Sequence, residues 1–585
     1  METHWDIMPK TPEDIFEKLN ALPKLVSTLL YNRNIKTTKE ADEFLNPVYS
    51  KNVHDPFLFQ DMQKAVDRIF IAIEKKENII IYGDYDADGI SSAILLDSII
   101  EKLGGGVSVF LPHRQNDGYG LNIKNIEQFA KDEVNLIITC DCGISNRNEV
   151  KKAKKLGIDT IITDHHTVPD ILPDAVAVIH PGIKNTTYPD NTLAGAGVAF
   201  KLLQGLLKHH KKTNEVLPDG EKHEAFEKWS LDMVAIATVA DMVPLKGESR
   251  TLTKYGLLVL NKTRRAGLQK LYVEARIAEV DGKLKKRITE ETIGFYIAPR
   301  INAAGRISHP KIAFDLLKTK SKTNAVDLAY LLDTHNKNRR QETEIILKDA
   351  LHIVEKEQYD KEVLCVIGKN WSSGLVGLVA SKLKEKYNRP ALVVSHTQSL
   401  VGSGRSITGF NMIEAMQKMP EFFVKFGGHP MACGFTLKHI DIVEDFQNSL
   451  IKYFLETGDK DRRKVIKIDT EVDLEKLDWD MYNYVQRFEP FGKDNEKPKY
   501  LANELTITHI QQMGKGGKHV RLMVKHRSQR IFKVVGWNLC GRKEKDWCQI
   551  LRIGDKIDIV FELGINEWNG TTELQRTIID IRKTT

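Results

Sequence analysis

Three short clusters of acidic and imidazole side chains follow apolar runs in the first third of the chain. The clusters are Asp84 with Asp86 and Asp88, then Asp141, then Asp164 with His165 and His166, and the preceding runs span 78–83, 134–139 and 160–163. Carboxylates separated by a single residue repel one another unless a cation lies between them. Carboxylate oxygen and imidazole nitrogen together suit Mn²⁺ and similar ions, whereas oxygen alone favours Mg²⁺ or Ca²⁺. The clusters therefore predict a divalent metal centre.

A centre of this kind is suited to hydrolysis of phosphate esters. Two divalent ions about 3.5–4 Å apart can clamp a phosphate and lower the pKa of a bound water until it attacks as hydroxide. Two other interpretations remain open. A single Asp after a strand is often a helix N-cap. The segment 84–89 also resembles a calcium loop, although its twelfth position is Leu95 where a calcium loop has Glu.

The elements that must position these clusters alternate between strand and helix. Apolar runs span 78–83, 134–139, 160–163 and 175–179, and helical patterns separate the first three of them, over 89–102 and up to residue 155. Short runs with helical spacers are typical of parallel strands joined by crossover helices. The carboxyl ends of such strands meet at one edge of the sheet, where ligands bind. We therefore expect an α/β domain with all three clusters at that edge.

The rest of the chain predicts several further parts. Helical patterns cover 230–240 and 324–356, and a second strand–helix–strand unit occupies 363–395. Short alternating runs separated by glycines predict a small antiparallel barrel, with strands at 519–526, 530–537, 556–563 and 574–581. The expected parts are an N-terminal segment 1–60, a catalytic α/β domain 61–260, a helical connector 261–345, a second α/β domain 346–460 facing the first across a cleft, and the barrel 461–585 after a polar linker.

Composition and charge restrict the class of protein. Of 585 residues, 41% are hydrophobic and 28% are charged, with a formal net charge of +7, so we expect a soluble chain of several domains. No apolar stretch reaches the roughly 20 residues that cross a bilayer. The first ten residues lack the pattern of a secretory signal, which predicts a cytoplasmic protein. Six scattered cysteines without a CxxC pair predict neither a disulfide framework nor a Cys-rich zinc site.

The motifs resemble those of the DHH phosphoesterase superfamily. The segments Asp-Tyr-Asp-Ala-Asp-Gly at 84–89, Asp-Cys-Gly at 141–143 and Asp-His-His at 164–166 occur in the family's order, and Asp241 fits a further expected acid. The resemblance implies a centre of two manganese ions, with magnesium as an alternative, in which Asp141 bridges the ions and Asp84 is an additional ligand or positions water. It places His166 beside the substrate phosphate. The implied ligands are Asp84, Asp86, Asp88, Asp141, His165 and Asp241, and the implied catalytic residues are Asp84, Asp86, Asp141, His166 and His429.

A second resemblance concerns the domain that accompanies DHH domains, called DHHA1. Gly-Ser-Gly-Arg-Ser at 402–406 and Gly-Gly-His at the start of 427–435 match its substrate-binding signatures. Glycine-rich turns expose backbone N–H groups, and an Arg with a Ser can hold a phosphate. A glycine pair alone most often marks a turn. The resemblance implies substrate contacts from Ser403, Arg405, Gly427, Gly428 and His429.

Two more segments are similar to the RecJ family of bacterial single-strand-specific 5′→3′ exonucleases. These are 111–120 and 299–306, and they imply DNA contacts from Arg114, Arg300, Asn302 and Arg306. Arg114, together with Ser403 and Arg405, is expected to anchor a 5′ phosphate. For each Arg, the alternative is a surface ion pair. The sequence departs from many relatives at Ser372 and Ser373, where they carry a His after Trp371.

The predicted barrel lies where RecJ-like proteins carry an OB fold, a module that grips single strands through basic and aromatic side chains. The window 511–533 contains seven Lys and Arg residues and no acidic residue. We expect DNA contacts from Lys515, Lys518, Arg521 and Trp537, with Phe532 as a second aromatic that could stack on bases. A basic run can also be only a solvated face.

The sequence as a whole predicts a single-stranded-DNA-specific 5′→3′ exonuclease that releases 5′-mononucleotides in DNA recombination and repair. The resemblance implies single-strand binding protein and a helicase as partners, and we expect a monomer. An alternative is a phosphodiesterase or pyrophosphatase for small nucleotides on the same core, which would not use the basic barrel. A second alternative is a non-catalytic scaffold, which the complete set of expected ligands disfavours.

Overall fold

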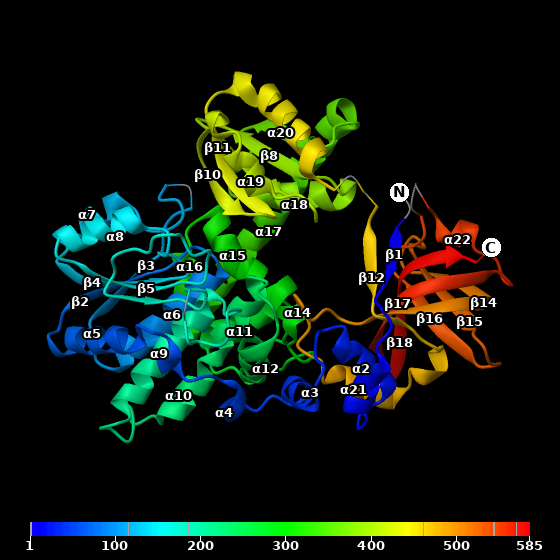
Figure 1. Cartoon of the computed structure of the whole chain (residues 1–585), viewed down its shortest axis with the longest axis horizontal. Helices are drawn as coiled ribbons and strands as arrows, with labels where there is room; N and C mark the ends of the chain where they lie inside the picture. The colour runs from blue at the N-terminus through cyan, green and yellow to red at the C-terminus, as the bar shows by residue number, and fades with distance from the viewer. Residues whose placement is uncertain are drawn as a thin grey trace. The chain divides into compact units, whose positions relative to one another are not determined.

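The computed structural model of the chain describes residues 3–114, 116–184, 186–459, 461, 463–541, 545–568 and 570–584 (Figure 1). Lys460, at the predicted domain boundary, and Arg462 of the predicted linker lie outside these ranges. The chain forms two compact units. The first comprises Met1–Asn52, Pro244–Thr251 and Lys464–Thr585, and the second Val53–Val243 and Leu252–Arg463. Among the described residues, no helix is both long enough and apolar enough to cross a membrane.

The second unit begins with a five-stranded sheet whose order is β3-β2-β4-β5-β6. Its strands are β2 (Asn78–Tyr82), β3 (Val107–Phe110), β4 (Val134–Cys140), β5 (Asp159–Thr163) and β6 (Ala177–Ile179). Every neighbouring pair is parallel. The predicted parallel α/β sheet is therefore confirmed. Only β3 was not expected, because this edge strand is half-buried and lacks the continuous apolar run of the central strands.

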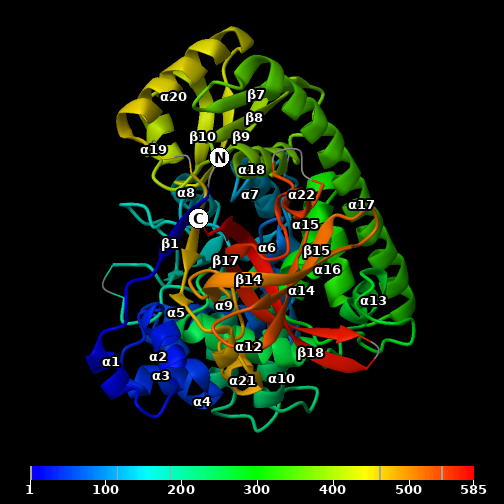
Figure 2. The same cartoon turned by 90° about the vertical axis from the view of Figure 1, so that its right-hand side faces the viewer.

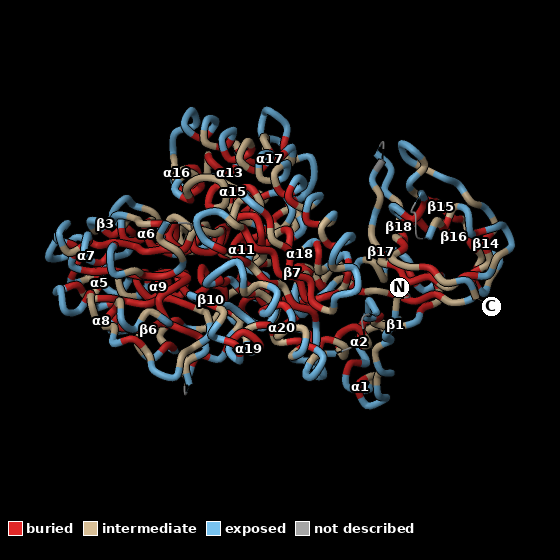
Figure 3. The backbone as a smooth tube through the Cα atoms, turned by 90° about the horizontal axis from the view of Figure 1, so that it is seen from above, coloured by how far each residue is buried: buried red, intermediate tan, exposed pale blue. Residues whose placement is uncertain are grey.

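Helices α6 (Ala87–Lys102), α9 (Gly195–His210) and α11 (Leu231–Ala240) form the core beside this sheet. Most of their residues are buried, as Figure 3 shows for α6 and α11. Helices that are apolar on all sides are expected where neighbours cover every face. These three helices begin or end at the carboxyl edge of the sheet, so they supply further side chains there.

A helical segment connects the first sheet to the second. It contains α13 (Ala266–Glu274), α15 (Ala298–Ile307), α16 (Lys311–Lys318) and the long helix α17 (Lys322–Ile353). Helix α17 packs against α13, α15 and α16 and then continues to α18 (Val376–Tyr387) of the second sheet's layer. Figure 2 shows this course, with α17 running from α13 towards β7 (Leu364–Lys369). One helix therefore links both α/β parts of the unit.

The second sheet has the order β10-β11-β9-β8-β7. Its strands are β7 (Leu364–Lys369), β8 (Ala391–His396), β9 (Leu400–Arg405), β10 (Phe423–His429) and β11 (Ala432–Leu437). The pair β7–β8 is parallel and the other pairs are antiparallel. The signature segments 402–406 and 427–435 thus fall on adjacent strands, with Ser403 opposite Gly434 in the register.

The first unit contains the predicted barrel. Strands β14 (Lys499–Met513), β15 (His519–Lys525), β16 (Ile531–Gly536), β17 (Lys556–Trp568) and β18 (Thr571–Lys583) pair in the order β14-β15-β16-β18-β17, and β14 closes the ring with β17. The OB-type barrel is confirmed. It is not wholly antiparallel, because β16 and β18 run parallel. Strand β14 was not expected, since glutamate and asparagine interrupt its apolar pattern.

A buried arginine holds the short segment 244–251 in the first unit. Arg250 is 1% exposed and donates hydrogen bonds to five backbone carbonyl oxygens, those of Phe44, Arg487, Phe488, Glu489 and Pro490. A buried cation is costly unless its donors are satisfied, and a guanidinium has five of them. Arg250 therefore ties N-terminal and C-terminal parts of the chain into one core.

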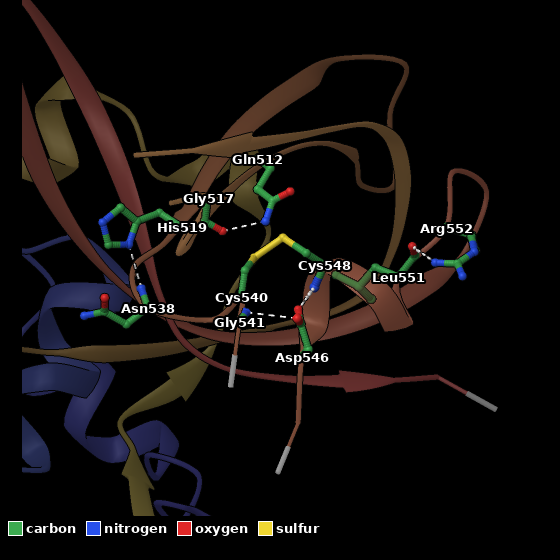
Figure 4. The surroundings of a disulfide bond; sticks show 10 residues. All are labelled: Gln512, Gly517, His519, Asn538, Cys540, Gly541, Asp546, Cys548, Leu551 and Arg552. Carbon is green, nitrogen blue, oxygen red and sulfur yellow. Dashed lines mark hydrogen bonds between the residues drawn. A yellow bond between two sulfur atoms is a disulfide. The ribbon is translucent and has the colours of Figure 1, made fainter. Parts of the chain in front are cut away.

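The first unit also contains a disulfide between Cys540 and Cys548, which the scattered cysteines did not predict (Figure 4). The side chain of Asp546 accepts hydrogen bonds from the backbone N–H groups of Gly541 and Cys548 and so begins the short helix α22 (Trp547–Ile550). Cys140, Cys142, Cys365 and Cys433 are free and buried. A spacing of eight residues carries no pairing signal of its own, because the pairing depends on how the loop folds.

The close contact between β2 and α6 generates a prediction for Gly89. A Cβ atom at this position would lie 2.5 Å from the backbone nitrogen of Asp84, whereas one at Gly106 would meet nothing nearer than 3.8 Å. We expect Gly89→Ala to lower the free energy of unfolding by about 2–3 kcal/mol, because the helix must move away from the strand. Gly106→Ala is the matched control. Urea unfolding measures both, and equal midpoints for the two variants would contradict the prediction.

Candidate metal centre and phosphate-binding residues

The carboxyl ends of β2, β4 and β5 bring the predicted clusters together. The His165 Nε2 atom lies 3.2 Å from an Asp141 carboxylate oxygen and 3.7 Å from a carboxylate oxygen of Asp88. It lies equally far from a carboxylate oxygen of Asp241, the residue that ends α11. Residues that are far apart in the sequence thus meet at a single point, as the parallel sheet predicted.

The ligand atoms form three overlapping sets. In each set, one oxygen or nitrogen atom from every residue lies within 4.8 Å of the others. The sets are Asp84 with Asp86 and Asp141, Asp88 with His165 and Asp241, and Asp141 with His165 and His166. Two of the sets share Asp141, and the six acidic and imidazole residues predicted as ligands all belong to at least one of them.

Glycine and an unusual backbone conformation place Asp141 at the centre. Asp141 has φ 60°, in the left-handed region that non-glycine residues rarely adopt and that is often found at functional sites. A Cβ atom on Gly195 would lie 2.7 Å from the Asp141 Cβ atom. Only glycine therefore allows the first turn of α9 to lie directly against this carboxylate.

Asp86 and Asp88 also have structural roles. The Asp86 side chain accepts hydrogen bonds from the backbone N–H groups of Asp88 and Gly89 and is the N-cap of α6. The two oxygens of Asp88 accept from the N–H groups of Gly195 and Ala196, at the start of α9. Helix capping therefore describes part of what these two residues do. It does not account for Asp84, Asp141 or His165.

The electrostatics of the centre fit a divalent cation. Within the described chain, Asp84 Oδ1, Asp141 Oδ1 and His165 Nε2 are buried and have no hydrogen-bond partner. Burial, and then the neighbouring carboxylates, raise the pKa values of Asp84, Asp88 and Asp141 well above normal. Burial, and then His166, lower the pKa of His165 to about 3 and leave its imidazole neutral. Carboxylates that repel one another around a neutral imidazole are suited to bind a cation.

Asp164, to which the sequence analysis gave no separate role, holds His166 as a cation beside this centre. Burial alone would lower the pKa of His166, but a 2.8 Å hydrogen bond with Asp164 and the charge of that carboxylate raise it to about 9. Asp164 also accepts from the N–H groups of Ile144, His165 and His166. The Tyr119 hydroxyl lies 3.0 Å from the same imidazole and donates to the Asp141 carbonyl. Tyr119 belongs to the segment 111–120. The resemblance of that segment to the RecJ family was the signal in the sequence that could have identified this residue.

His429 reaches the same place from the second sheet. Its ring stacks on that of His166, with centroids 5.9 Å apart and an interplanar angle of 9°. The residue is the last of β10, and the preceding Gly428 has φ 140°. A Cβ atom on Gly428 would lie 2.4 Å from the Ala432 carbonyl oxygen, whereas Gly427 has open space around it. The tight turn after β10 therefore requires Gly428 and aims His429 at His166.

Three of the predicted phosphate contacts form a cationic group. Arg114 lies over the Tyr85 ring, 3.9 Å from its centroid. Arg405 donates to the Ser403 hydroxyl, and Arg306 donates to the Gly374 carbonyl. None of these three guanidinium groups has a carboxylate partner within the ranges that the structure describes. Burial, and then Arg114 and Arg339, lower the pKa of Arg306 to about 9. The group is therefore arranged to receive an anion.

The structure places Arg300 and Asn302 in contacts with the protein itself. The Arg300 Nε and Nη2 atoms donate to Asp333 at 2.9 and 2.8 Å, in a pair that is almost fully buried. The Asn302 side-chain oxygen accepts from the backbone N–H of Ala87 at 2.7 Å. Arg300 thus joins α15 to α17, and Asn302 supports the start of α6. For Arg300, the structure therefore shows an ion pair within the protein, which was the alternative to a DNA contact.

The basic window of the barrel lies on β15, on β16 and on the loops around them. Lys515 and Lys518 are exposed, and Trp537 is 47% exposed, with its ring against His519. Arg521 is half-buried and donates to Gln511. Phe532 is 4% exposed and belongs to the barrel core. The expectation that Phe532 stacks on bases was wrong, because period-two alternation along β16 turns it inward.

Comparison with known families covers most of the chain. Residues 78–238 match the DHH family, N-terminal domain, residues 360–456 match the DHHA1 domain, and residues 468–580 match the RecJ OB domain. The single-stranded-DNA-specific exonuclease RecJ of Bacillus subtilis (strain 168) is 36% identical over 97% of this chain and 69% of its own length. The enzyme of the same name from Salmonella typhimurium is 30% identical over 96% of each chain. The chain belongs to the RecJ family.

Solved structures of RecJ agree with this assignment. The crystal structure of RecJ in complex with Mn²⁺ from Thermus thermophilus matches with a TM-score of 0.82 and covers all of this chain and 80% of that one. At 23% identity, this likeness shows the fold alone. A crystal structure of exonuclease RecJ bound to manganese is 28% identical, with a TM-score of 0.58 over 68% of this chain and 96% of that chain.

The repulsion within the acidic cluster predicts how the protein responds to metal. Mn²⁺ should raise the melting temperature, because binding to the folded state alone stabilises it by about 2.7 kcal/mol at 100-fold the Kd. Asp141→Asn should stabilise the metal-free protein, since it removes one repelling charge, and should lose most of the Mn²⁺-dependent rise. The exposed Asp349→Asn is the control. Differential scanning calorimetry with EDTA or Mn²⁺ measures this, and an undiminished rise in Asp141→Asn would remove Asp141 from the ligand set.

Proposed function

We propose that the protein is a single-stranded-DNA-specific exonuclease that works in the 5′→3′ direction and releases 5′-mononucleotides in DNA recombination and repair. The observation that carries the proposal is the convergence of Asp141, His165 and the acidic residues at the ends of β2, β4 and β5. The names of the relatives, single-stranded-DNA-specific exonuclease RecJ, supply the substrate class. The cationic group beside the cluster supports a polyanionic substrate.

Divalent metal ions are part of the proposal, and we infer two of them, with Mn²⁺ ahead of Mg²⁺. The ligands would be Asp84, Asp86, Asp88, Asp141, His165 and Asp241, whose oxygen and nitrogen donors suit Mn²⁺. Relatives have been crystallised with each of these metals. When bound, such ions act as Lewis acids on a phosphate and lower the pKa of bound water.

The protein's own groups have distinct tasks around the phosphate. His166 carries a positive charge at neutral pH and can donate a hydrogen bond to a phosphate oxygen, while Asp164 fixes its ring. His429 stacks beside it and shields one side. Arg114, Arg405 and Ser403 would hold the terminal 5′ phosphate, which sets the direction of hydrolysis. Gly427 has open space around it, which would leave room for the sugar–phosphate chain, and Gly428 forms the tight turn that directs His429.

The cellular setting follows from the substrate. We place the protein in the cytoplasm, with the DNA on which it acts, as a monomer. A single-strand binding protein and a helicase are the partners that we propose, because an exonuclease restricted to single strands needs a strand to be exposed for it. We propose that the barrel holds the incoming strand through Lys515, Lys518, Arg521 and Trp537.

The proposed polarity and chemistry lead to one assay. With Mn²⁺, the wild type should release labelled mononucleotides first from the 5′ end of a 5′-phosphorylated single strand and should leave a blunt duplex intact. Asp141→Asn should lose activity by more than about 100-fold, since even indirect partners of metal ligands cost 10–100-fold, while strand binding persists. Asp349→Asn should behave as the wild type. Nucleotides released first from the 3′ end, or normal turnover by Asp141→Asn, would refute the proposal.

A second assay separates the exonuclease from a small-nucleotide phosphodiesterase. The triple variant Lys515→Gln, Lys518→Gln and Trp537→Ala should bind a 30-nucleotide strand more weakly, because each base–aromatic stack contributes roughly 1–3 kcal/mol. Its turnover of a 5′-phosphorylated dinucleotide should be unchanged. The control variant, Arg527→Gln with Lys533→Gln, removes two charges that are already paired with Glu471, Asp473 and Glu573. Unchanged kinetics of the triple variant on long strands would favour the phosphodiesterase.

A further inference from the structure

The disulfide of the first unit lies beside residues that the proposed function assigns to the DNA strand. Cys540 follows Trp537 by three residues, and its backbone N–H donates to the Lys518 carbonyl at 3.1 Å. Between them, the N–H of Asn538 donates to Nδ1 of His519 at 2.8 Å (Figure 4), and the His519 ring packs against Trp537. The chain after β16 and the loop before β15 therefore hold each other in place.

The other half of the disulfide belongs to α22, which is anchored in the barrel by other contacts. Trp547 is 4% exposed, lies in the barrel core and donates its backbone N–H to the Leu539 carbonyl at 3.1 Å. The side chain of Asp546 caps the same short helix. Formation of α22 therefore does not require the disulfide. What the disulfide adds is a covalent tie from α22 to Cys540, and through Cys540 to the loop that ends at Lys518.

Opening the disulfide is compatible with the fold of the barrel. The strands β14 to β18 close the ring through their own backbone pairing. Cys540 is 3% exposed and lies among the apolar side chains of the core. A free Cys behaves as a small hydrophobic side chain, so the Cys540 thiol can occupy the place of the bonded sulfur. The same core therefore accommodates the disulfide and the dithiol.

The remaining cysteines indicate that disulfides are not a general device of this chain. Cys140, Cys142, Cys365 and Cys433 are free and buried. In a cytosolic protein, which is the setting proposed above, a disulfide is usually transient and serves catalysis or redox sensing. The bonded pair lies outside the metal centre, in a loop region beside the proposed strand contacts. Its position therefore favours a regulatory role over a structural or catalytic one.

The same place offers ligands for a metal ion, but the arrangement disfavours one. Atoms of Cys540, Asp546 and Cys548 lie within 4.8 Å of one another. The Asp546 carboxylate is already used, because one oxygen accepts the N–H of Gly541 and the other accepts that of Cys548. Within the described ranges, no fourth acidic, imidazole or thiol group joins this set, whereas structural zinc sites have four ligands. Thiol–disulfide exchange is the chemistry that the pair supports.

We propose that Cys540 and Cys548 form a reversible redox modification site that sets how tightly the barrel holds single-stranded DNA. The assignment rests on the proposed exonuclease function, in which Lys518 and Trp537 contact the strand. In the disulfide form, α22 holds Cys540 and restricts both contact residues before the strand arrives. Groups that are fixed in advance lose less conformational freedom on binding. The dithiol form lacks this tie and binds the strand more weakly.

The exchange partner is a low-molecular-weight thiol such as glutathione. Its thiolate attacks the sulfur of Cys548, which is half-buried, because Cys540 is almost fully buried. The S–S bond breaks, and Cys540 leaves with the electron pair and takes up a proton. A second small thiolate attacks the mixed disulfide at the sulfur of the first, so that Cys548 leaves, takes up a proton and the oxidised small thiol is released. Two electrons and two protons thus pass to the protein, and the small disulfide reverses the reaction.

Strand binding in the two redox states tests the proposal. The probe is a 30-nucleotide oligothymidylate with a 3′ fluorophore, and fluorescence anisotropy in EDTA gives its Kd for protein equilibrated with reduced or oxidised glutathione. For the reduced wild type, we expect a Kd about 5-fold higher, which matches the lower end of what one base–aromatic stack contributes. Because the wild type supplies both states, the comparison does not depend on the folding of a variant. Alkylation followed by mass spectrometry confirms that Cys540 and Cys548 change state.

Two variants separate this pair from the other cysteines. Cys548→Ser should bind the 30-mer as the reduced wild type does, in either glutathione buffer. Cys365→Ala removes a buried free cysteine of β7 and is the matched control, which should keep the full redox response. Hydrogen exchange at the backbone N–H groups of Asn538 and Cys540 should be faster in the reduced wild type. Hydrolysis of a 5′-phosphorylated dinucleotide with Mn²⁺ should be the same for Cys548→Ser and the wild type.

Several results would overturn the proposal. They are a disulfide that reduced glutathione does not open, equal Kd values for the two redox states of the wild type, a redox response that persists in Cys548→Ser, and zinc bound to the reduced protein. Failure of the proposed function gives a different result. A wild type that binds the 30-mer in neither redox state, or that releases no nucleotide with Mn²⁺, would contradict the exonuclease itself.

Discussion

The structure of the second unit depends on carboxylates that repel one another inside the protein. Asp84, Asp88 and Asp141 are almost fully buried, and their pKa values are raised by burial and then by neighbouring carboxylates of the cluster. The fold nevertheless brings them together, because parallel strands end at a common edge and because Gly89 and Gly195 let two helices pack against that edge. This arrangement stores unfavourable charge in the free protein, and a divalent cation removes it. Affinity for the ion and stability of the fold are therefore linked.

A second group of like charges lies beside the first and has the opposite sign. Arg114, Arg306, Arg339 and Arg405 have no carboxylate partner in the part of the chain that the structure describes, although a cluster of carboxylates lies nearby. Direct pairing between the two groups would satisfy both and leave nothing to bind a metal or a phosphate. A backbone carbonyl holds Arg306 and an aromatic ring holds Arg114 instead. Both groups thus stay available, and under the proposed function a phosphate would be attracted by the arginines as well as by metal ions held in the acidic cluster.

The residues whose type and spacing carry chemistry were predictable, and the residues that orient them were less so. The strands before Asp84, Asp141 and Asp164 are continuous apolar runs, so the sheet and its reactive edge followed from the sequence. The edge strand β3 and the long strand β14 did not, because exposure weakens the apolar pattern. Arg300 looks like a phosphate contact in sequence, but Asp333, 33 residues away, neutralises it. Phe532 lies in a basic window, but it occupies a position on β16 whose side chain points into the barrel core. Contacts with residues that are distant in the sequence decide the roles of such side chains. Residue spacing alone does not reveal these contacts.

The two units present their positive charges in different ways, and under the proposed function the difference bears on how a single strand would be held. Lys515 and Lys518 are exposed, so contacts with phosphates would be made there at little desolvation cost and would exchange readily with salt ions. Arg306 is half-buried and its guanidinium donates to the Gly374 carbonyl, so a phosphate that reached it would be held in one position. A chain that removes one nucleotide at a time needs both properties. Under the proposed function, exchangeable contacts would let the strand advance, and a fixed arginine would hold a phosphate for the acidic cluster to act on.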